Sequence, residues 1–379
     1  MNISLRQTMS IQDQAVSSGG GKGECCDSSS KWGIIGCGDV TEVKSAPCCF
    51  KSSTNGDNDS NNSSSISNSS VVLCMRRDRD KATDYAARHG IALSCSTLEE
   101  FYALSAENGV QNVYIATPPN SHKVLAIEAL SRGYNVYIEK PIALNSSEAN
   151  SIYESLQKYP ERKLSVAHYR RELAMFQHVK SLLDCKSIGD VRSCNLRCWK
   201  TTKADELNNP DNWRLNAEVS GGGYFHDLAP HQLDILIYLF GYPLSSQGIS
   251  STPSQGSGTH LLAMDHVYGL SVFPNNVVFN GSWCFAVPER DAVDECLITG
   301  TTGSIKFSFF GLSGTLCLIS ATHSDNPKTE EWVYEHPKHI QEPMISKVIS
   351  YFDSSIARNP CSIQDAIVVM NMMDTFSSS

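Results

Sequence analysis

Between Lys31 and Pro141 the sequence alternates short apolar runs with amphipathic segments. The apolar runs have the length of buried strands, and the segments between them carry apolar residues at helical spacing. Successive strand–helix units of this kind predict a parallel, doubly wound sheet. We expect strands at Val71–Met75, Ile91–Leu93 and Asn112–Ala116, and helices from Asp78 to Gly90, from Leu98 to Leu104 and from Asn120 or Ser121 to Gly133. The expected apolar face of the last helix includes Val124, Ile127 and Leu130.

The last apolar run of this region, Tyr134–Ile138, leads directly into Glu139-Lys140-Pro141. Proline has no backbone N–H to donate to a neighbouring strand, so we expect the strand to end there. In open α/β sheets, ligands bind outside the carboxyl ends of the strands, which is where Lys140 would lie. Taken alone, a Glu-Lys-Pro sequence is more often a solvated turn than a catalytic site, and the remaining motifs decide between these two interpretations.

An earlier apolar run, Trp32–Ile35, is followed by Gly36-Cys37-Gly38. This pattern is typical of a strand that ends in a tight turn and leads into a helix. Gly36 permits the turn, Gly38 lets the backbone approach a pyrophosphate, and the helix N-terminus favours negative charge. The last position of this dinucleotide fingerprint is Thr41 instead of Gly or Ala, which loosens the match. The cofactor contacts predicted in this turn are Gly36, Gly38, Asp39 and Val40.

The polar segment 52–70 has one apolar side chain, so we expect a disordered insertion. Without its 19 residues, Arg76 follows Gly38 by 19 positions. A dinucleotide fold carries its ribose-reading residue at a similar distance, ~20 residues. An acid there would bind the ribose hydroxyls, whereas Arg76 and the adjacent Arg77 can pair with a 2′-phosphate. We therefore predict NADP in preference to NAD; the alternative is that the two arginines form a solvated strand end.

From Val191 onward strand-like runs dominate, separated by turns such as Asn275-Asn276 and Gly300–Gly303. They predict a second, α+β domain with a large, open and mainly antiparallel sheet. A length of 379 residues suits about two domains of roughly 150 residues each together with flexible segments. We expect a disordered tail at 1–30, a cofactor-binding domain at 31–142 and a substrate-binding and oligomerisation domain at 143–379.

Ser220–Gly223, a serine and three glycines, precedes a helical pattern that carries Asp227 and His231. A spacing of four residues places the carboxylate and the imidazole on one helix face, and the glycines allow a ligand to approach closely. The imidazole can accept a substrate proton near neutral pH while the carboxylate orients it. The alternative is an ordinary helix start with His231 packed in the core. A metal site formed by His226, His231 and Asp234 is not favoured, because His226 and His231 are five residues apart and point in different directions on a helix.

Four motifs occur in this order: Gly36-Cys37-Gly38, Thr117–His122, Glu139-Lys140-Pro141, and the triple glycine followed by Asp227 and His231. In this combination the chain, from about Lys31 onward, resembles the Gfo/Idh/MocA oxidoreductases, which include glucose-fructose oxidoreductase and inositol dehydrogenases. The combination of Glu-Lys-Pro with Asp-x-x-x-His is more specific than the glycine turn. The resemblance implies an N-terminal Rossmann domain and a C-terminal domain with an open sheet.

The resemblance also implies a reaction in which a hydride passes between nicotinamide and a carbinol carbon. Lys140 would hydrogen-bond the reacting oxygen, His231 would exchange its proton, and Asp227 would bind substrate or orient the pair. Tyr169 and Arg170, which follow a strand assigned to the second domain, are predicted substrate contacts. Further predicted cofactor contacts are Thr117, Pro118, Asn120, His122, Glu139 and Lys140, with a structural role as the alternative for His122.

The formal net charge of -9 leaves no basic field, so neither nucleic acid nor an anionic membrane is an expected partner. No apolar run approaches the ~20 residues of a membrane span. The 14 cysteines are scattered without a C-x-x-C motif, which argues against a zinc site. We expect reduced thiols in a cytoplasmic protein, with no bound metal.

The leading hypothesis is an NAD(P)-dependent oxidoreductase that acts on a sugar, polyol or related hydroxy or keto compound. One alternative is a nucleotide-binding regulatory protein without turnover, and another is a hydrolase or lyase that works through transient oxidation. An open sheet with an uncovered apolar face tends to find a partner, so we also expect a homodimer or a larger homo-oligomer.

Overall fold

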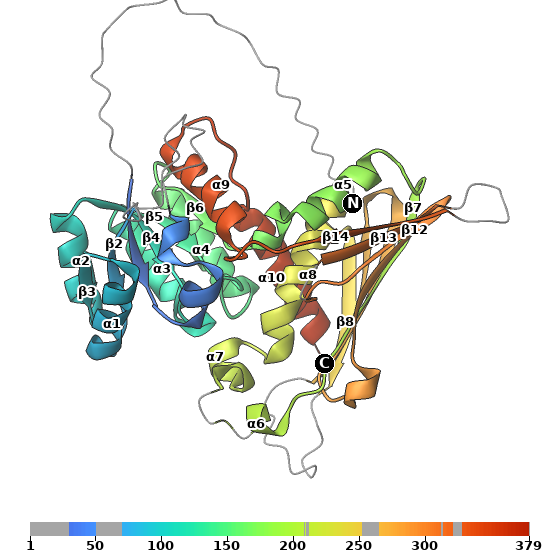
Figure 1. Cartoon of the computed structure of the whole chain (residues 1–379), viewed down its shortest axis with the longest axis horizontal. Coiled ribbons are helices and arrows are strands. Elements are labelled where there is room, and N and C mark those ends of the chain that lie inside the picture. The colour runs from blue at the N-terminus through green and yellow to red at the C-terminus, as the bar shows by residue number, and fades with distance from the viewer. Residues whose placement is uncertain are drawn as a thin grey trace, which may run out of the picture.

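The computed structural model describes residues 30–50, 70–207, 209, 212–251, 265–311, 314–320 and 328–378. Two sheets organise these residues, and helices pack between and around them (Figure 1). The predicted tail at 1–30 and the predicted insertion at 52–70 lie outside the described residues, apart from Ser30 and Ser70. Phe50 O accepts hydrogen bonds from Ser70 N at 2.8 Å and from Ser70 Oγ at 2.6 Å. Phe50 and Ser70 therefore lie side by side.

The first sheet has six parallel strands in the order β3-β2-β1-β4-β5-β6. This result confirms the predicted doubly wound sheet, and the strand order reverses between β1 and β4. Folds of this type bind their ligands at the carboxyl ends of the strands beside such a reversal. The strands are β1 (Lys31–Ile35), β2 (Val71–Met75), β3 (Leu93–Cys95), β4 (Val110–Ile115), β5 (Asn135–Ile138) and β6 (Leu164–Val166).

Two boundaries in this sheet differ from the prediction. The third strand begins at Leu93 instead of Ile91, because the Ile91 N–H closes the end of the preceding helix by bonding Ala86 O at 2.9 Å. The sheet also continues past residue 142, the predicted end of the cofactor domain, because β6 pairs in parallel with β5. Tyr169 and Arg170 therefore follow a strand of the first sheet instead of a strand of the second domain.

Helix α1 (Arg79–His89) has the ends that the sequence predicts. The Asp78 carboxylate accepts a hydrogen bond from Lys81 N at 3.1 Å, and Gly90 has φ +65°, the left-handed conformation that glycine tolerates at a helix end. Three further helices accompany this sheet: α2 (Leu98–Glu107), α3 (His122–Ser131) and α4 (Ser146–Lys158).

The predicted apolar face of α3 is partly wrong, because Val124 is 60% exposed although Leu130 is buried. Ala126 and Ala129 are fully buried. These small side chains let the helix lie close to its neighbours, which turns the buried stripe away from Val124.

The connection after β1 is shorter than the expected helix. The π-helical turn η1 (Val40–Lys44) is followed by the 3₁₀ turn η2 (Pro47–Cys49). Pro47 cannot donate a backbone hydrogen bond and its ring would clash with a preceding helical turn, which explains why the helix stops. The last residue of η1, Lys44, consequently lies close to the glycine turn.

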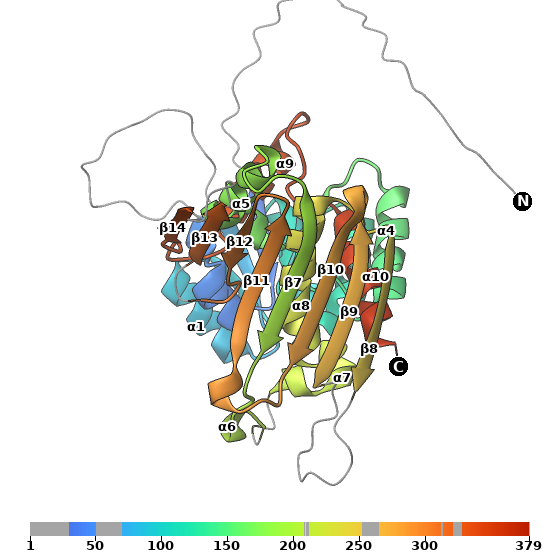
Figure 2. The ribbon, with the colours of Figure 1, turned by 90° about the vertical axis from the view of Figure 1, so that its right-hand side faces the viewer.

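The second sheet has eight strands in the order β14-β13-β12-β11-β7-β10-β9-β8. Only the β7–β10 pair is parallel among these neighbours, so the predicted mainly antiparallel sheet is confirmed. Its helices lie behind the strands in Figure 2, and the opposite face is turned towards the viewer. The strands are β7 (Val191–Trp199), β8 (Ser245–Ser251), β9 (His266–Phe273), β10 (Val277–Cys284), β11 (Val293–Gly300), β12 (Gly303–Phe307), β13 (Gly314–Ser320) and β14 (Lys328–Tyr334).

The long helices of the C-terminal half connect the two sheets. Helix α8 (Tyr224–Phe240) packs against β10, where the Phe225 ring lies 5.2 Å from the Trp283 ring. Helix α9 (Glu342–Asp353) returns to the first domain, and its Phe352 stacks on Trp32 of β1 at 5.4 Å. The remaining long helices are α5 (Ala174–Asp184) and α10 (Ile363–Ser377). Within the described ranges, no helix is long and apolar enough to cross a membrane.

Candidate active site

Lys140 is presented at the carboxyl end of β5, and its backbone is anchored by Glu139. The Glu139 side chain is buried, and its Oε1 accepts hydrogen bonds from Tyr114 Oη at 2.6 Å and Gln341 Nε2 at 2.7 Å. Its Oε2 accepts from Lys140 N at 3.2 Å. Glu139, a predicted cofactor contact, therefore directs its carboxylate into the core and holds the backbone of Lys140.

The Lys140 ammonium crosses to the second domain and meets Asp227 in the first turn of α8. Lys140 Nζ lies 2.7 Å from Asp227 Oδ1 and 2.9 Å from Asp227 O. Arg214 Nε donates to the other carboxylate oxygen at 2.9 Å. Burial opposes ionisation of the carboxyl, but the two cations hold the pKa of Asp227 below its ordinary value. Asp227 is therefore charged throughout the neutral range.

His231 lies one turn further along α8, on the same helix face as Asp227. His231 is 3% exposed, its ring packs edge-on against Tyr169 at 5.1 Å, and its buried Nδ1 has no hydrogen-bond partner among the residues that the structure describes. Burial, followed by the positive charges of Lys140 and Arg170, holds the pKa of His231 well below its usual range. The ring is therefore neutral at neutral pH and can accept a proton.

The glycines before α8 allow the helix to begin close to the first domain. Gly221 has φ +91°, and a Cβ there would lie 2.9 Å from the His226 ring and 3.1 Å from Leu144 O. Gly223, the residue before the helix, has φ +74° and ψ -148°, a conformation essentially limited to glycine. Asp227 can reach Lys140 because the start of α8 lies against the loop that follows β5.

The glycine turn after β1 packs closely against the loop that follows β4. Gly36 has φ +99°, and a Cβ there would lie 2.8 Å from the backbone carbon of Ala116. The buried Thr41 hydroxyl accepts from Gly38 N at 3.1 Å and donates to Gly38 O at 2.9 Å. Thr41, the departure from the fingerprint, thus closes the turn with its side chain. Asp39 precedes η1 and Val40 is its first residue.

Of the two predicted arginines, Arg76 lies beside this turn. Its Nη1 donates to Cys37 O at 2.9 Å, and the side chain is half-buried. Arg77 is exposed. The end of β2 therefore brings one guanidinium to the glycine turn, as the spacing predicts.

His122 joins the loops that follow β4 and β5. Its Nε2 lies 2.8 Å from Thr117 O, its Nδ1 lies 2.9 Å from Pro141 O, and the side chain is fully buried. Burial lowers the pKa of His122, so the neutral ring donates to only one of these carbonyls. The nearby Thr117 hydroxyl accepts from Ser121 Oγ at 2.7 Å. His122 therefore positions the two loops, which agrees with the structural role that was the alternative to a cofactor contact.

Of the remaining predicted cofactor contacts after β4, Asn120 is exposed, and Pro118 is half-buried directly before the 3₁₀ turn η3 (Pro119–Ser121). Tyr169 and Arg170 lie in η4 (Tyr169–Glu172), directly beside His231. The fold thus places the predicted substrate contacts next to the predicted base.

Arg171 and Asp234 form a buried ion pair that the sequence analysis did not anticipate. Arg171 Nη2 and Nε donate to the two oxygens of Asp234 at 2.7 Å and 2.8 Å, and Arg171 Nη1 lies 2.9 Å from Asp365 Oδ2. Asp234, weighed above as a metal ligand, is committed to this pair. The described residues contain no cluster of histidine, cysteine and acidic side chains that could hold a metal.

Arg214 and Lys44 were also missed, and no local signal marks either. Arg214 lies in the short turn η5 (Trp213–Leu215), a few residues before the glycine motif, and reaches Asp227 because the chain folds back. Lys44 follows the glycine turn by a few residues and contributes to the electrostatic field at His231.

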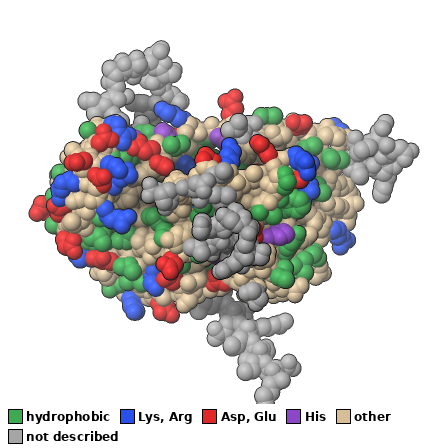
Figure 3. All heavy atoms as spheres, turned by 90° about the horizontal axis from the view of Figure 1, so that it is seen from below, with side chains coloured by type: hydrophobic (Ala, Val, Ile, Leu, Met, Phe, Trp, Pro, Cys, Tyr) green, Lys and Arg blue, Asp and Glu red, His purple; other side chains and the backbone are tan. Residues whose placement is uncertain are grey.

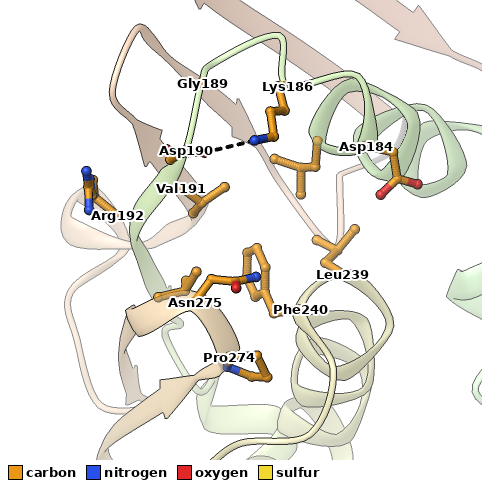
Figure 4. A pocket seen from close by; sticks show the side chains of 12 residues that line it. Asp184, Lys186, Gly189, Asp190, Val191, Arg192, Leu239, Phe240, Pro274 and Asn275 are labelled. Atoms are coloured by element: carbon orange, nitrogen blue, oxygen red, sulfur yellow. Dashed lines mark hydrogen bonds and ion pairs between the residues drawn. The ribbon is translucent and has the colours of Figure 1, made fainter.

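A separate cavity of about 510 Å³ lies at the other end of α8, beside the β9–β10 turn (Figure 4). Leu239 and Phe240 form part of its wall, and an ion pair between Lys186 and Asp190 lies at its edge. None of the predicted site residues lines it. The cavity has mixed charges, and Phe240 in its wall lies nine residues, or about 13 Å, further along the helix than His231. The cavity is therefore separate from the site described above.

The fold and the arrangement of these residues define a two-domain, dinucleotide-binding oxidoreductase. Residues 30–168 match the oxidoreductase family with an NAD-binding Rossmann fold, and residues 176–306 match the GFO/IDH/MocA C-terminal domain. The chain belongs to the GFO/IDH/MocA oxidoreductase family, which confirms the resemblance inferred from its motifs.

One relative is the Oxidoreductase P35 of Formosa agariphila, which is 40% identical over 346 residues, covering 91% of this chain and 97% of that protein. The fold is similar to an aldose-aldose oxidoreductase from Caulobacter crescentus in complex with glycerol, with a TM-score of 0.73, 18% identity, and coverage of 92% and 96%. It is also similar to levoglucosan dehydrogenase in complex with NADH and levoglucosan, with a TM-score of 0.72, 22% identity and the same coverage.

Proposed function

We propose that this protein transfers a hydride between a nicotinamide cofactor and the carbinol or keto carbon of a sugar, polyol or related small molecule. The observation that carries the proposal is the 2.7 Å contact between Lys140 Nζ and Asp227 Oδ1, with His231 one helical turn away. Named sugar oxidoreductases with the same fold, such as levoglucosan dehydrogenase, support this substrate range.

The residues at the first sheet fit a dinucleotide. Gly36 leaves no room for a side chain, and Arg76 lies at the neighbouring strand end. A bound nicotinamide would supply the hydride acceptor or donor. Arg76 supports NADP as the preferred cofactor, although levoglucosan dehydrogenase was seen with NADH. We therefore propose NADP and retain NAD as the other possibility.

The side chains of this chain divide the acid–base work. In oxidation, the neutral His231 accepts the proton of the substrate hydroxyl, while the Lys140 ammonium hydrogen-bonds the same oxygen and stabilises its developing negative charge. Asp227 holds the ammonium in place, and Arg214 fixes the other carboxylate oxygen. In reduction, His231 returns the proton.

The direct experiment compares wild type with Lys140→Met and with a surface control, Lys158→Met, on a panel of sugars, polyols and their oxidised forms. We expect nicotinamide absorbance to change with wild type and the control, and to stay constant with Lys140→Met. Unchanged turnover in Lys140→Met would exclude the assigned role. Product formed without net change in reduced cofactor would favour the transient-oxidation alternative instead.

We also propose self-association through the open face of the second sheet. Exposed apolar side chains on this face include Tyr268, Leu270 and Val278 on the adjacent strands β9 and β10. Such a surface is typical of an interface between copies. Light scattering at micromolar concentration tests the proposal, and a monomeric mass would exclude it.

We propose a cytoplasmic location and neither nucleic acid nor membrane as a partner. The described cysteines are free thiols, which are typical of reducing compartments. Acidic and basic side chains are interspersed on the face shown in Figure 3, where no extended basic patch is visible among the described residues.

A further inference from the structure

Arg171 is a buried cation in the turn η4, and its guanidinium is held on two sides. Its Nε and Nη2 donate to the two oxygens of Asp234 at 2.8 Å and 2.7 Å, and its Nη1 donates to Asp365 Oδ2 at 2.9 Å. A planar guanidinium that binds both oxygens of one carboxylate fixes the direction of the contact as well as its length. The pair therefore holds η4 in one position against α8, the helix that carries Asp234.

The same turn makes a second contact with the same side of α8. Asp234 follows His231 by three residues, so the two side chains are neighbours on the helix surface. The Tyr169 ring, two residues before Arg171 in η4, lies edge-on to the His231 ring at 5.1 Å. The ion pair and the ring contact thus join the same two elements, and the position of one contact sets the position of the other.

The orientation of the His231 ring depends on the rings beside it. In many histidine sites a hydrogen bond at the second ring nitrogen fixes the tautomer and the plane of the ring. The buried Nδ1 of His231 has no such partner in the described part of the chain. Its ring instead packs against Tyr169 and Phe310, at interplanar angles of 70° and 69°. A displacement of η4 would remove one of these two supports.

Stability alone explains the Arg171 pair poorly. Burying two charges costs about as much as their attraction returns, and apolar replacements are often at least as stable. A buried network whose members are all bonded does, however, fix one arrangement of the elements that it joins. This network extends to the start of α10, where Tyr242 Oη donates to the second oxygen of Asp365 at 2.8 Å. The effect of the network is therefore a fixed position of η4.

We infer that Arg171 is a positioning residue for the proposed base: by holding η4 on α8 through Asp234, it keeps the Tyr169 ring against His231 and the imidazole in the orientation that proton transfer needs. The inference rests on the proposed hydride transfer and deepens it. It gives Tyr169, a predicted substrate contact, the role of orienting the base. Tyr169 is 2% exposed, which leaves little of its surface for a substrate.

The kinetic test changes one contact at a time. Arg171→Lys retains the charge but loses the fork, and Tyr169→Leu removes the ring. A small misplacement of a reacting group is costly, so we expect each substitution to lower kcat, expressed per folded molecule, by at least about tenfold. Because Arg171 acts through Tyr169, the double variant should be no slower than the slower single variant. Tyr169→Phe keeps the ring and should recover most of the loss.

Arg132→Lys is the matched control. The Arg132 guanidinium also contacts a carboxylate, Glu128 at 2.9 Å, and lies over an aromatic ring, that of Tyr102. It lies at the end of α3, away from η4 and α8, so the same chemical change there should alter kcat by less than about twofold.

A spectroscopic measurement separates the inference from the proposed function, because it needs no substrate. The resonance of the His231 ring is followed by NMR in protein labelled at its histidines and is assigned by its loss in His231→Gln. We expect Arg171→Lys and Tyr169→Leu to move this resonance in the same direction, and Arg132→Lys to leave it in place. Such a movement without turnover of any compound by wild type would reject the proposed function and support the positioning role.

The result that would overturn the inference is equally specific. A His231 resonance that stays in place in folded Arg171→Lys, or losses of kcat that multiply in the double variant, would leave Arg171 with a structural role only. If Arg171→Lys does not fold, Asp234→Asn takes its place with the same expectations, because the amide keeps one oxygen for the guanidinium.

Discussion

Lys140 and Asp227 are 87 positions apart, yet their side chains meet at 2.7 Å across the boundary between the two domains. Lys140 is carried by the first sheet and Asp227 by the helix that lies on the second sheet. The contact joins the first sheet to a helix packed on the second sheet, so changes in either residue should affect both stability and the proposed chemistry.

Asp227→Asn should destabilise the protein. The substitution leaves the Lys140 side chain, which is 9% exposed, without its counter-charge. Removing one partner of a buried ion pair costs on the order of 3 kcal/mol. Urea unfolding measures the loss, and the double variant Lys140→Met/Asp227→Asn should recover part of it. Asp190→Asn is the control. Its ion pair with Lys186 should contribute little, because the Lys186 and Asp190 side chains are 74% and 66% exposed. Equal effects of the two single substitutions would contradict the prediction.

The pH profile of substrate oxidation reports the charge of His231. In the proposed mechanism oxidation requires the neutral ring, and burial together with nearby positive charges holds the pKa of His231 well below its ordinary value. As pH falls from mildly alkaline values to 6.5, the ring stays neutral, so kcat/KM should not decline through this group. The decline should begin only at lower pH. Lys44→Met removes a positive charge and should shift that decline upward in pH; a wild-type inflection near 6.5 would argue against His231 as the base.

Two alanine substitutions in the glycine turn should have different effects. Gly36→Ala should destabilise the fold by more than about 1 kcal/mol, because φ is positive and the new Cβ would meet the Ala116 backbone. Gly38→Ala has no such obstacle, since its Cβ would meet nothing within 4 Å. It should retain stability but weaken NAD(P)H binding by about tenfold, the equivalent of ~1.4 kcal/mol. Thermal unfolding and nicotinamide fluorescence measure the two effects, and unchanged binding in Gly38→Ala would exclude the turn as the phosphate contact.

Arg76→Ala tests the cofactor preference. If Arg76 pairs with a 2′-phosphate, the substitution should weaken NADPH binding by at least about tenfold and leave NADH binding nearly unchanged. Arg77→Ala is the control, because Arg77 is exposed and Arg76 contacts Cys37 O beside the turn. Parallel titrations followed by nicotinamide fluorescence give both affinities. Equal binding of the two cofactors by wild type would contradict the preference for NADP.

Local sequence patterns predicted local structure well where the signals act within one helical turn. Asp78 and Gly90 mark the ends of α1, and α2 begins at the predicted Leu98. Caps and apolar periodicity depend on residues three or four positions apart, so the chain specifies them without its tertiary context.

Two strands of the second sheet, β8 and β14, lack the strand-like apolar runs on which the sequence prediction of this sheet depends. β8 is rich in serine, and the first four residues of β14, Lys328–Glu331, are all polar or charged. Both are edge strands, where the partner strand supplies the backbone hydrogen bonds that the side chains do not predict. Their assignment therefore required the assembled sheet.

The site residues show the same difference between local signals and tertiary contacts. Gly36, Lys140, Asp227 and His231 are visible in the sequence because turn geometry, strand ends and helix spacing place each one locally. The packing of Arg170 against Phe309 and Phe310, the charge of Lys44 near His231 and the contact of Lys140 with Asp227 depend on segments far apart in the chain. Packing of α8 and α9 between the sheets decides those distances, and electrostatic interactions follow distance in space, not separation in sequence.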